Sequence, residues 1–464
     1  MDRVGILVVS KCLSSAAIID TFMRSQKYRP EFYVVEKQAN PFNLERAKFH
    51  AVVPDLNLRE VTRIARRFRD RVSFGLTDTE DFVTAGGRDA MEKDAGIQML
   101  CVTRKYAVER SKAEQRQLFD RVFSGANPRY RIFDPAKYRD HSDALAQFRR
   151  TASELSEVVV KPDAPARGAG VGVWGKDFRS DKAMSAFFLN ALSKGRVVVE
   201  EKVEGEESSF HSFSDGRHFV PAPLTRDYKR SLDGNKGKLT GGMGSYRNAS
   251  RGLPFLPPAE WDRLVDAEEA AFRRWKGRGS DPGLRGIVLY DAIMHTGNGF
   301  KVLERNSRGG NTEVINILAT MADDFVDVCH RILDGSLKGI RFTREASVVT
   351  CAVPSSYGVE PAVPAENQYV DLAPAYEFSR RHPDRLRVFP MDIRVEAGVS
   401  KMGTSRTVAV VGLGGSVEAA RRRSLAGTNA LSGPLRWRTD IASRRDITDS
   451  SAHLRTLRRV VATA

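Results

Sequence analysis

The chain has 464 residues, of which 41% are hydrophobic and 28% are charged, and this composition is typical of a globular protein rather than a disordered one. No apolar run approaches the ~18 residues that a membrane-spanning helix needs. The 4 cysteines are widely scattered, which disfavours a structural zinc site and a disulfide framework. The net charge of +16 comes largely from scattered arginine pairs, without a pattern typical of nucleic-acid-binding proteins. We therefore expect a cytoplasmic protein that binds small anionic molecules, and neither nucleic acid nor membrane.

Residues 1–105 alternate between apolar strand patterns and amphipathic helix patterns. Strands are expected at 4–9, 32–37 and 50–56, and helices at 14–23 and 58–71. This alternation predicts an open, doubly wound parallel sheet. The turn after the first strand reads Ser-Lys-Cys-Leu-Ser-Ser, and its residues Ser10, Lys11 and Ser14 are candidates for contact with an anion.

The segment 158–175 has the pattern of a strand, a glycine loop and a second strand. Three valines precede Lys161, and Gly168, Gly170 and Gly172 follow before the second apolar run. No helical pattern follows the glycines, so the segment is neither a P-loop nor a dinucleotide-binding fingerprint. Backbone N–H groups of such a loop can approach a phosphate closely, although a purely structural hairpin would also explain the glycines.

Three further segments carry polar residues that suit a nucleotide and metal site. A strand at 197–199 ends in two glutamates and leads to Gly-Glu-Glu-Ser at 205–208; a solvated strand end is the alternative. A charged loop, Thr-Arg-Asp-Tyr-Lys-Arg at 225–230, precedes Thr-Gly-Gly-Met-Gly at 240–244, and an ordinary surface loop would explain both.

The third segment is a strand on which Glu304 and Asn306 share one face and Arg305 points to the other. A carboxylate and an amide oxygen in this arrangement suit the hard cation Mg²⁺. An edge strand with solvated polar residues is the alternative. On the preceding predicted strand, 286–294, Asp291 is either an additional metal or substrate contact or a hydrogen-bonded strand residue.

In this order, the segments resemble the ATP-grasp enzymes, and among them the glycinamide ribonucleotide synthetases (phosphoribosylamine–glycine ligases). The family motif E-x-N-x-R-x-G-D-P-E reads E-R-N-S-R-G-G-N-T-E at 304–313. The family's first turn, G-x-G-G-R-E, is not retained. The resemblance implies an α/β fold with an N-terminal doubly wound parallel sheet (1–105), a split ATP-grasp domain of two subdomains (106–340) and a small C-terminal α/β domain (341–464).

The resemblance also implies roles for individual residues. The expected ATP-binding residues are Lys112, Lys161, Arg167, Gly168, Gly170, Glu200, Glu201, Val203 and Glu207, with the adenine read near Val203 and the ribose hydroxyls bound by Glu207. Glu304 and Asn306 are expected to bind Mg²⁺ or Mn²⁺. The catalytic residues would be Arg308, Asp227 and Lys229, and the substrate would contact Gly241, Gly242, Asn311 and Glu313.

The implied activity is an ADP-forming ligation of a carboxylate to an amine through an acyl phosphate, in a monomer or homodimer. Glycine and 5-phosphoribosylamine, the pair used in purine biosynthesis, are the leading substrates. The altered first turn, and Asn311-Thr312 in place of Asp-Pro, favour instead a diverged ligase for a different carboxylate and amine. A non-enzymatic, nucleotide-binding paralogue is a further alternative.

The remaining elements complete the expected fold. Helices are predicted at 257–275 and 321–333, and the C-terminal region is expected to contain strands near 346–353 and 406–411 followed by a helix. The glycines of Val-Gly-Leu-Gly-Gly-Ser at 411–416 do not fit the dinucleotide fingerprint, and we predict a β-hairpin turn there.

Overall fold

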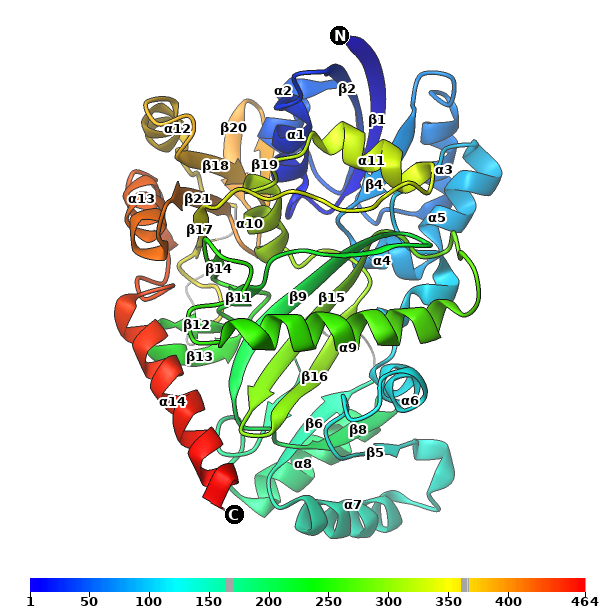
Figure 1. The fold of residues 1–464 in the computed structure, drawn as a ribbon, viewed down its shortest axis with the longest axis vertical. Coiled ribbons are helices and arrows are strands. Elements are labelled where there is room, and N and C mark those ends of the chain that lie inside the picture. Colours follow the sequence, from blue (N-terminus) through cyan, green and yellow to red (C-terminus); the bar gives the residue numbers. More distant parts are fainter. Residues whose placement is uncertain (164–169, 360–364, 366, 464) are drawn as a thin grey trace.

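The computed structural model describes residues 1–163, 170–359, 365 and 367–463 (Figure 1). A parallel sheet forms one end of the molecule, a large antiparallel sheet crosses the middle, and a small antiparallel sheet forms the other end. This arrangement confirms the predicted α/β fold class. Among the described residues, no helix is long and apolar enough to cross a membrane.

The N-terminal sheet has the order β3-β2-β1-β4 with parallel pairing throughout, as predicted for a doubly wound unit. Strand β2 begins earlier than predicted because its first residue, Tyr28, pairs with Asp2 at the start of β1. The elements are β1 (Asp2–Ser10), α1 (Ser15–Met23), β2 (Tyr28–Glu36), α2 (Pro41–Arg46), β3 (Ala47–Val52), α3 (Leu58–Arg66), β4 (Phe74–Thr77), α4 (Glu80–Thr84) and α5 (Gly87–Ala90).

The small sheet at the other end has the order β5-β8-β6-β7 and packs on two helices. Its core includes Phe148 and Phe188, whose rings stack with centroids 4.1 Å apart. The pairing of β6 with β7 confirms the predicted strand–loop–strand pattern, whereas Arg167 and Gly168 of the connecting loop lie outside the described residues. The elements are α6 (Lys112–Val122), β5 (Tyr130–Phe133), α7 (His141–Leu155), β6 (Val158–Pro162), β7 (Gly172–Val173), α8 (Asp181–Leu192) and β8 (Val197–Glu201).

The central sheet has 10 strands, and eight of them follow one path in the order β16-β15-β9-β11-β14-β17-β21-β18. The long helix α9 lies across it (Figure 1), and Trp261 and Leu264 of this helix pack in the same core as Phe210 and Ile293 of the sheet. These strands and helices are β9 (Glu206–Asp215), β10 (Phe219–Pro221), β11 (Thr225–Asp227), β14 (Gly244–Arg247), α9 (Pro258–Lys276), β15 (Arg285–Thr296), β16 (Gly299–Asn306), α10 (Glu313–Ala319), α11 (Phe325–Leu333), β17 (Ala346–Pro354), β18 (Leu386–Pro390), β21 (Val408–Gly414) and β22 (Leu435–Arg436).

The sheet continues from the predicted ATP-grasp region into the C-terminal region without a break, because β14 pairs with β17. The division of the chain at residues 105 and 340 therefore stays a prediction. Smaller elements frame the sheet: β12 (Arg230–Leu232), β13 (Lys236–Leu239), α12 (Ala373–Arg380), β19 (Ile393–Glu396), β20 (Val399–Met402), α13 (Val417–Asn429) and α14 (Arg444–Thr463).

The predicted β-hairpin turn at 411–416 is wrong. Strand β21 runs through Gly414, and Ser416 then caps helix α13 by accepting a hydrogen bond from the Ala419 N–H. A Cβ atom at Gly412 would lie 2.1 Å from the Ala420 carbonyl oxygen. Glycine is needed at this position because the helix backbone rests directly on the strand.

Candidate active site

The sheet β5-β8-β6-β7 presents Lys161 toward β16, the strand that carries Glu304 and Asn306. Its Nζ atom lies 2.7 Å from Glu200 Oε2 and donates to the Leu303 carbonyl oxygen of β16 at 3.1 Å. Arg116 of α6 holds the same Glu200 carboxylate at 2.6 Å and also donates to the carbonyl oxygens of Val302 and Leu303. Burial lowers the pKa of Lys161, and Glu200 opposes that shift. Glu200 therefore acts by fixing a buried lysine and by tying the small sheet to β16.

The expected nucleotide-hinge residues lie along the link from β8 to β9, where the two sheets meet. Glu201 accepts from the guanidinium of Arg129 at 2.6 Å, near the surface. Glu207 at the start of β9 is 40% exposed and lies 3.3 Å from Lys229 Nζ. The positive charge of Lys229 holds the pKa of Glu207 below its ordinary value. This pair links the expected ribose contact to the charged loop at 225–230.

Strand β16 places Glu304 and Asn306 on the same face, as the sequence predicted. The side-chain amide of Asn306 lies 2.9 Å from both Glu304 Oε1 and Glu109 Oε1, where Glu109 comes from the short turn before α6. With its nitrogen toward the carboxylates, the amide donates to both. With its oxygen toward them, three oxygen atoms converge on one point, which is the donor set that Mg²⁺ prefers. The residues present therefore fit the expected metal.

The charges around this point support the fit. Although burial opposes ionisation, Lys112, Lys229 and Lys161 keep the pKa of Glu304 below its ordinary value. Burial raises the pKa of Glu109 to about 7. A divalent cation between the two carboxylates would favour the ionised form of both.

Arg305, on the opposite face of β16, has a structural environment. Its guanidinium is fully buried, 2.5 Å from Asp291 Oδ2 and 2.7 Å from Glu268 Oε2 of helix α9. Of the two roles considered for Asp291, the structure supports the hydrogen-bonded strand residue. Its carboxylate accepts hydrogen bonds from Arg305. The ion pairs of Arg305 with Asp291 and Glu268 fix α9 to the sheet, on the face of β16 opposite Glu304 and Asn306.

After Glu304 and Asn306, the motif continues into a loop that carries Arg308. Its guanidinium lies 2.8 Å from Glu109 Oε1 and 3.3 Å from Glu80 Oε2 at the N-terminal end of α4. Both acids raise the pKa of Arg308 against the opposing effect of burial, so the side chain is a fixed positive charge. Through Glu109 and Glu80, Arg308 connects the surroundings of Asn306 to the N-terminal sheet.

The last residue of the motif, Glu313, begins helix α10 within a buried polar cluster. Its carboxylate accepts from Ser209 Oγ at 3.2 Å and from Thr312 Oγ1 at 2.9 Å. Next to it, His211 Nε2 accepts from the Gly310 N–H at 3.0 Å and its ring stacks on Tyr290, with centroids 4.7 Å apart. Burial lowers the pKa of His211 to about 4, so this imidazole is a neutral acceptor at pH 7.

Asp227 ends strand β11 and faces the loop at 240–244. A Cβ atom at Gly242, which has a φ of +106°, would lie 2.7 Å from Asp227 Oδ1. Burial and the charge of Glu313 raise the pKa of Asp227, Lys229 opposes both, and the resulting pKa is about 8. Among the described residues, neither Asp227 Oδ1 nor Asn311 Oδ1 has a hydrogen-bond partner. Two polar oxygen atoms thus remain available near the predicted substrate contacts.

The turn after β1 differs from the expected anion contact. Asp78, which follows β4, accepts from the backbone N–H groups of Lys11 at 3.1 Å and Ser14 at 2.9 Å, and from Ser10 Oγ at 3.1 Å. The Lys11 ammonium group lies 2.5 Å from Glu80 Oε1. The donors predicted to contact a ligand anion are instead occupied by carboxylates of the chain itself.

Comparison with known proteins agrees with this geometry. Residues 117–314 match the family model for the ATP-grasp (A) domain of phosphoribosylglycinamide synthetase. A phosphoribosylamine–glycine ligase from Methanocella arvoryzae is 30% identical over 458 residues, which cover 98% of this chain and 99% of that protein. The chain belongs to the phosphoribosylamine–glycine ligase family. It is accordingly an ATP-grasp enzyme, a ligase that forms a carbon–nitrogen bond.

Solved structures agree on the fold of this family member. The crystal structure of a phosphoribosylamine–glycine ligase from Thermotoga maritima has a TM-score of 0.72 at 21% identity, covering 94% of this chain and 100% of that one. A biotin carboxylase domain from Hydrogenobacter thermophilus, solved in complex with MgADP, has a TM-score of 0.67 at 13% identity, covering 96% and 95% of the two chains.

Four residues of this ligase site were not predicted from the sequence. Glu109 lies three residues before Lys112 in the same Glu-Arg-Ser-Lys motif, so its position was a usable signal. Arg116, Asp78 and Arg406 have no such signal, because each acquires its role by contact with a distant segment: Arg116 with β16, Asp78 with the first turn, and Arg406 with Gly241.

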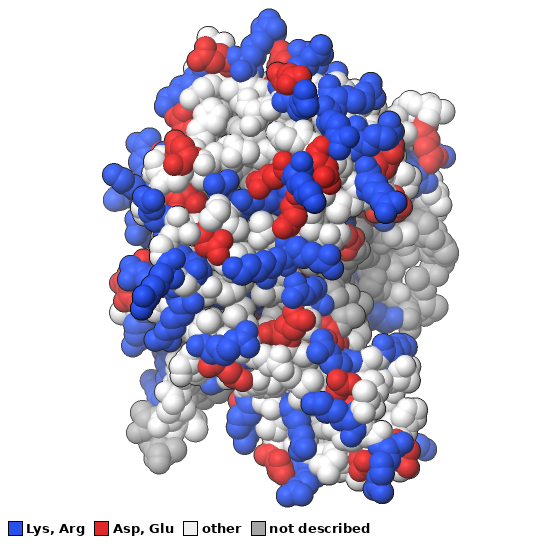
Figure 2. Space-filling model, turned by 90° about the vertical axis from the view of Figure 1, so that its right-hand side faces the viewer, with Lys and Arg blue, Asp and Glu red and all other residues white. Residues whose placement is uncertain are grey.

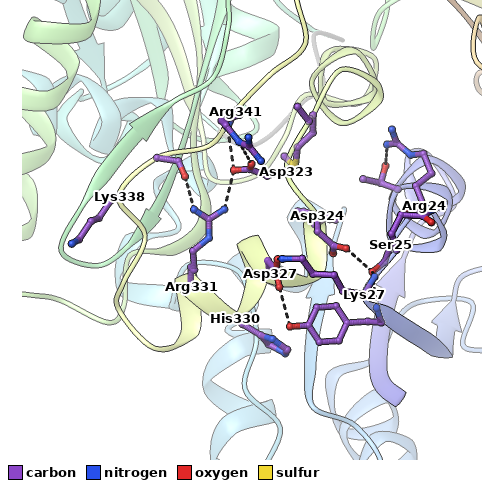
Figure 3. Close-up of a pocket in the computed structure, with 17 residues that line it drawn as sticks. Arg24, Ser25, Lys27, Asp323, Asp324, Asp327, His330, Arg331, Lys338 and Arg341 are labelled. Atoms are coloured by element: carbon purple, nitrogen blue, oxygen red, sulfur yellow. Dashed lines mark hydrogen bonds and ion pairs between the residues drawn. The ribbon is translucent and has the colours of Figure 1, made fainter. Parts of the chain in front are cut away.

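A cavity of about 1030 Å³ lies away from these residues, between the C-terminal end of α1 and helix α11. Figure 3 shows that several of its charged side chains interact with one another or with polar neighbours. Lys27 pairs with Asp327, while Arg331 and Arg341 lie 3.0 Å and 2.6 Å from Asp323. These pairs connect α11 to the N-terminal sheet and to the segment after it.

On the face shown in Figure 2, basic and acidic side chains are interspersed. The high net charge therefore does not form one continuous basic surface on that face. The expectation that nucleic acid is not a partner stays a prediction.

Proposed function

We propose that this ligase uses ATP to activate a carboxylate as an acyl phosphate and then joins it to an amine, releasing ADP and phosphate. The observation that carries the proposal is the convergence of Glu304, Asn306 and Glu109 beside Lys161. A divalent cation and a buried lysine are what phosphoryl transfer requires, because charge develops on the phosphoryl oxygens in the transition state.

The binding half of the mechanism follows from the fixed cations. Lys161, held by Glu200, and Lys112 at the start of α6 would neutralise the phosphates of ATP, while the N–H groups around Gly170 would cover them. Glu207 would accept from the ribose hydroxyls, and the backbone near Val203 would read the adenine edge. Glu304 and Asn306 would hold Mg²⁺, which would supply positive charge to stabilise the transferring phosphoryl group.

The acceptor half of the mechanism centres on Asp227. An amine must lose a proton when it attacks an acyl phosphate, and Asp227, with a pKa of about 8, would accept that proton in its ionised form, which predominates above pH 8. Arg308 and Lys229 would hold the carboxylate substrate in place. The loop of Gly241 and Gly242, with Asn311 and Glu313 opposite, would form the wall of the pocket.

Glycine and 5-phosphoribosylamine are the leading substrate pair, which would place the enzyme in purine biosynthesis. The support is the name and near-complete alignment of the relative from Methanocella arvoryzae. A ligase for a different carboxylate and amine is the second candidate, and the occupation of the first turn by Asp78 favours it.

ADP release from Mg-ATP, glycine and freshly prepared phosphoribosylamine, with each substrate withheld in turn, tests the proposal. We expect ADP release that requires both substrates. If ADP release requires a carboxylate but not phosphoribosylamine, a screen of amines identifies the second candidate. A chain that binds ATP but releases no ADP with any carboxylate would contradict the ligase mechanism.

A further inference from the structure

Arg406 is a buried cation beside the loop at 240–244. It precedes β21 and is 4% exposed. Its Nη1 atom donates to the Gly241 carbonyl oxygen, and its Nε atom has no hydrogen-bond partner among the described residues. A guanidinium group has five N–H donors, so most of this group's capacity is unused.

The other buried cations of the site differ from Arg406 in one respect. Lys11 pairs with Glu80, Lys161 with Glu200, and Arg308 with Glu109. Arg406 forms no ion pair with any residue that the structure describes. The charge of Arg406 does act on Asp227, whose pKa it lowers slightly against the larger effect of burial. With a pKa of about 8, however, Asp227 is largely protonated at neutral pH and does not neutralise the guanidinium.

The loop at 240–244 is shaped around this guanidinium. A Cβ atom at Gly241 would lie 2.8 Å from Arg406 Nη1 and 2.9 Å from both Cζ and Nη2. Glycine at 241 therefore allows Arg406 to lie flat against the loop backbone, on the same loop that faces Asp227 through Gly242. The arrangement places an uncompensated positive charge beside the proposed general base.

Burying a charge without a partner carries a large free-energy cost. A ligand that brings a negative charge removes that cost, and planar guanidinium groups are well suited to carboxylates and phosphates. The donors of the first turn cannot serve this purpose, because Asp78 already occupies them.

We propose that Arg406 binds an anionic oxygen group of a substrate, either the carboxylate of the amino acid or the phosphate of the amine. This inference rests on the proposed ligase function for the identity of the ligand. Arg406 would then be a residue of the C-terminal region that determines substrate specificity at the loop 240–244.

The variants Arg406→Gln and Arg406→Lys test it, with Arg422→Gln as the matched control, since Arg422 is an exposed arginine paired with Glu418 on α13. Thermal unfolding confirms that each variant folds, and Arg406→Lys retains the charge if Arg406→Gln unfolds. Two assays separate the sources of the anion: glycine-dependent hydroxamate formation with Mg-ATP and hydroxylamine, which needs no phosphoribosylamine, and ADP release at varied phosphoribosylamine.

If Arg406 binds the carboxylate, Arg406→Gln raises the KM for glycine in the hydroxamate assay by about 10- to 100-fold, the usual cost of a charge-assisted hydrogen bond. If it binds the phosphate, hydroxamate formation is unchanged and the KM for phosphoribosylamine rises by the same factor. Values equal to those of wild type and Arg422→Gln in both assays would overturn the inference.

The role of Arg406 can be tested even if the proposed ligase function is wrong. If the wild-type chain releases no ADP with any substrate, calorimetric titration of glycine and of inorganic phosphate still measures the anion site. Loss of binding in Arg406→Gln alone would then support the inference while the ligase mechanism fails. Equal binding by wild type and Arg406→Gln would overturn the inference.

Discussion

The nucleotide and metal half of the site and its acceptor half are built differently. In the first half, charged groups are matched by the chain itself: Lys161 by Glu200, and Arg305 by Asp291. In the acceptor half, Arg406 has no ion pair among the described residues, and Asp227 Oδ1 and Asn311 Oδ1 have no hydrogen-bond partner there.

The difference indicates how the two halves bind their ligands. In the nucleotide half, side chains that pair with one another are pre-organised to bind ATP, the ligand proposed for that half. A half that leaves buried polar groups without partners requires the ligand to complete it, and so carries the specificity. The four predictions below test this contrast.

The largest effect is expected on the metal-binding face. Glu304→Ala should lower kcat by at least about 100-fold, because the charge that stabilises the transferring phosphoryl group is no longer held. Thermal unfolding should be little changed, since Glu304 forms no ion pair with an arginine among the residues that the structure describes. ADP release and thermal unfolding measure the two effects, with Glu269→Ala on the exposed face of α9 as the control. Wild-type turnover in Glu304→Ala would rule out the metal assignment.

The opposite face of the same strand should affect stability instead. Arg305→Met leaves Asp291 and Glu268 buried without their partner, and removing one member of a buried ion network costs about 3–5 kcal/mol. We expect that loss in the free energy of unfolding measured with urea. An unchanged free energy of unfolding would show that the triad does not hold α9 to the sheet.

A smaller effect is expected at the acceptor loop. In Gly241→Ala the new methyl group would displace the Arg406 guanidinium, and the KM for the ligand of Arg406 should rise by about tenfold, while ATP binding stays unchanged. Steady-state kinetics and calorimetric titration of ATP measure these two quantities. A weakened affinity for ATP would show that the two halves of the site are not independent.

The smallest effect concerns pH. The pKa of Asp227 is raised to about 8, so the folded protein retains a proton that the unfolded chain releases near pH 4. Its stabilising contribution is therefore complete at low pH and is lost as the pH rises through 8. Between pH 5 and 7, the free energy of unfolding of the wild type should fall relative to that of Asp227→Asn by about 1 kcal/mol per pH unit. Parallel pH profiles in urea denaturation would contradict the shifted pKa.

The strands that carry the first half of the site could be predicted because their signals are local. The alternation of Glu304, Arg305 and Asn306 follows from the period of a strand, and the strand–loop–strand pattern around Lys161 is visible within 18 residues. The parallel N-terminal sheet was predicted for the same reason, from the alternation of strand and helix patterns.

The contacts made by Asp78 and Arg406 could not be predicted in this way, because they join distant segments. Asp78 reaches the first turn across 67 residues, and Arg406 reaches Gly241 across 165. The incorrect turn at 411–416 has a related cause. Gly412 was interpreted as a turn residue, whereas its role is to let α13 pack against β21, and close packing of this kind leaves no periodic signal in the sequence.

The central claim is that the chain activates a carboxylate by phosphorylation, and oxygen-isotope transfer tests it most directly. Glycine labelled with ¹⁸O in its carboxylate is supplied with Mg-ATP and phosphoribosylamine, and the released phosphate is analysed by mass spectrometry. The acyl-phosphate mechanism predicts one ¹⁸O atom in each phosphate formed with the amide product. Phosphate that forms together with the amide but contains no ¹⁸O would contradict the mechanism.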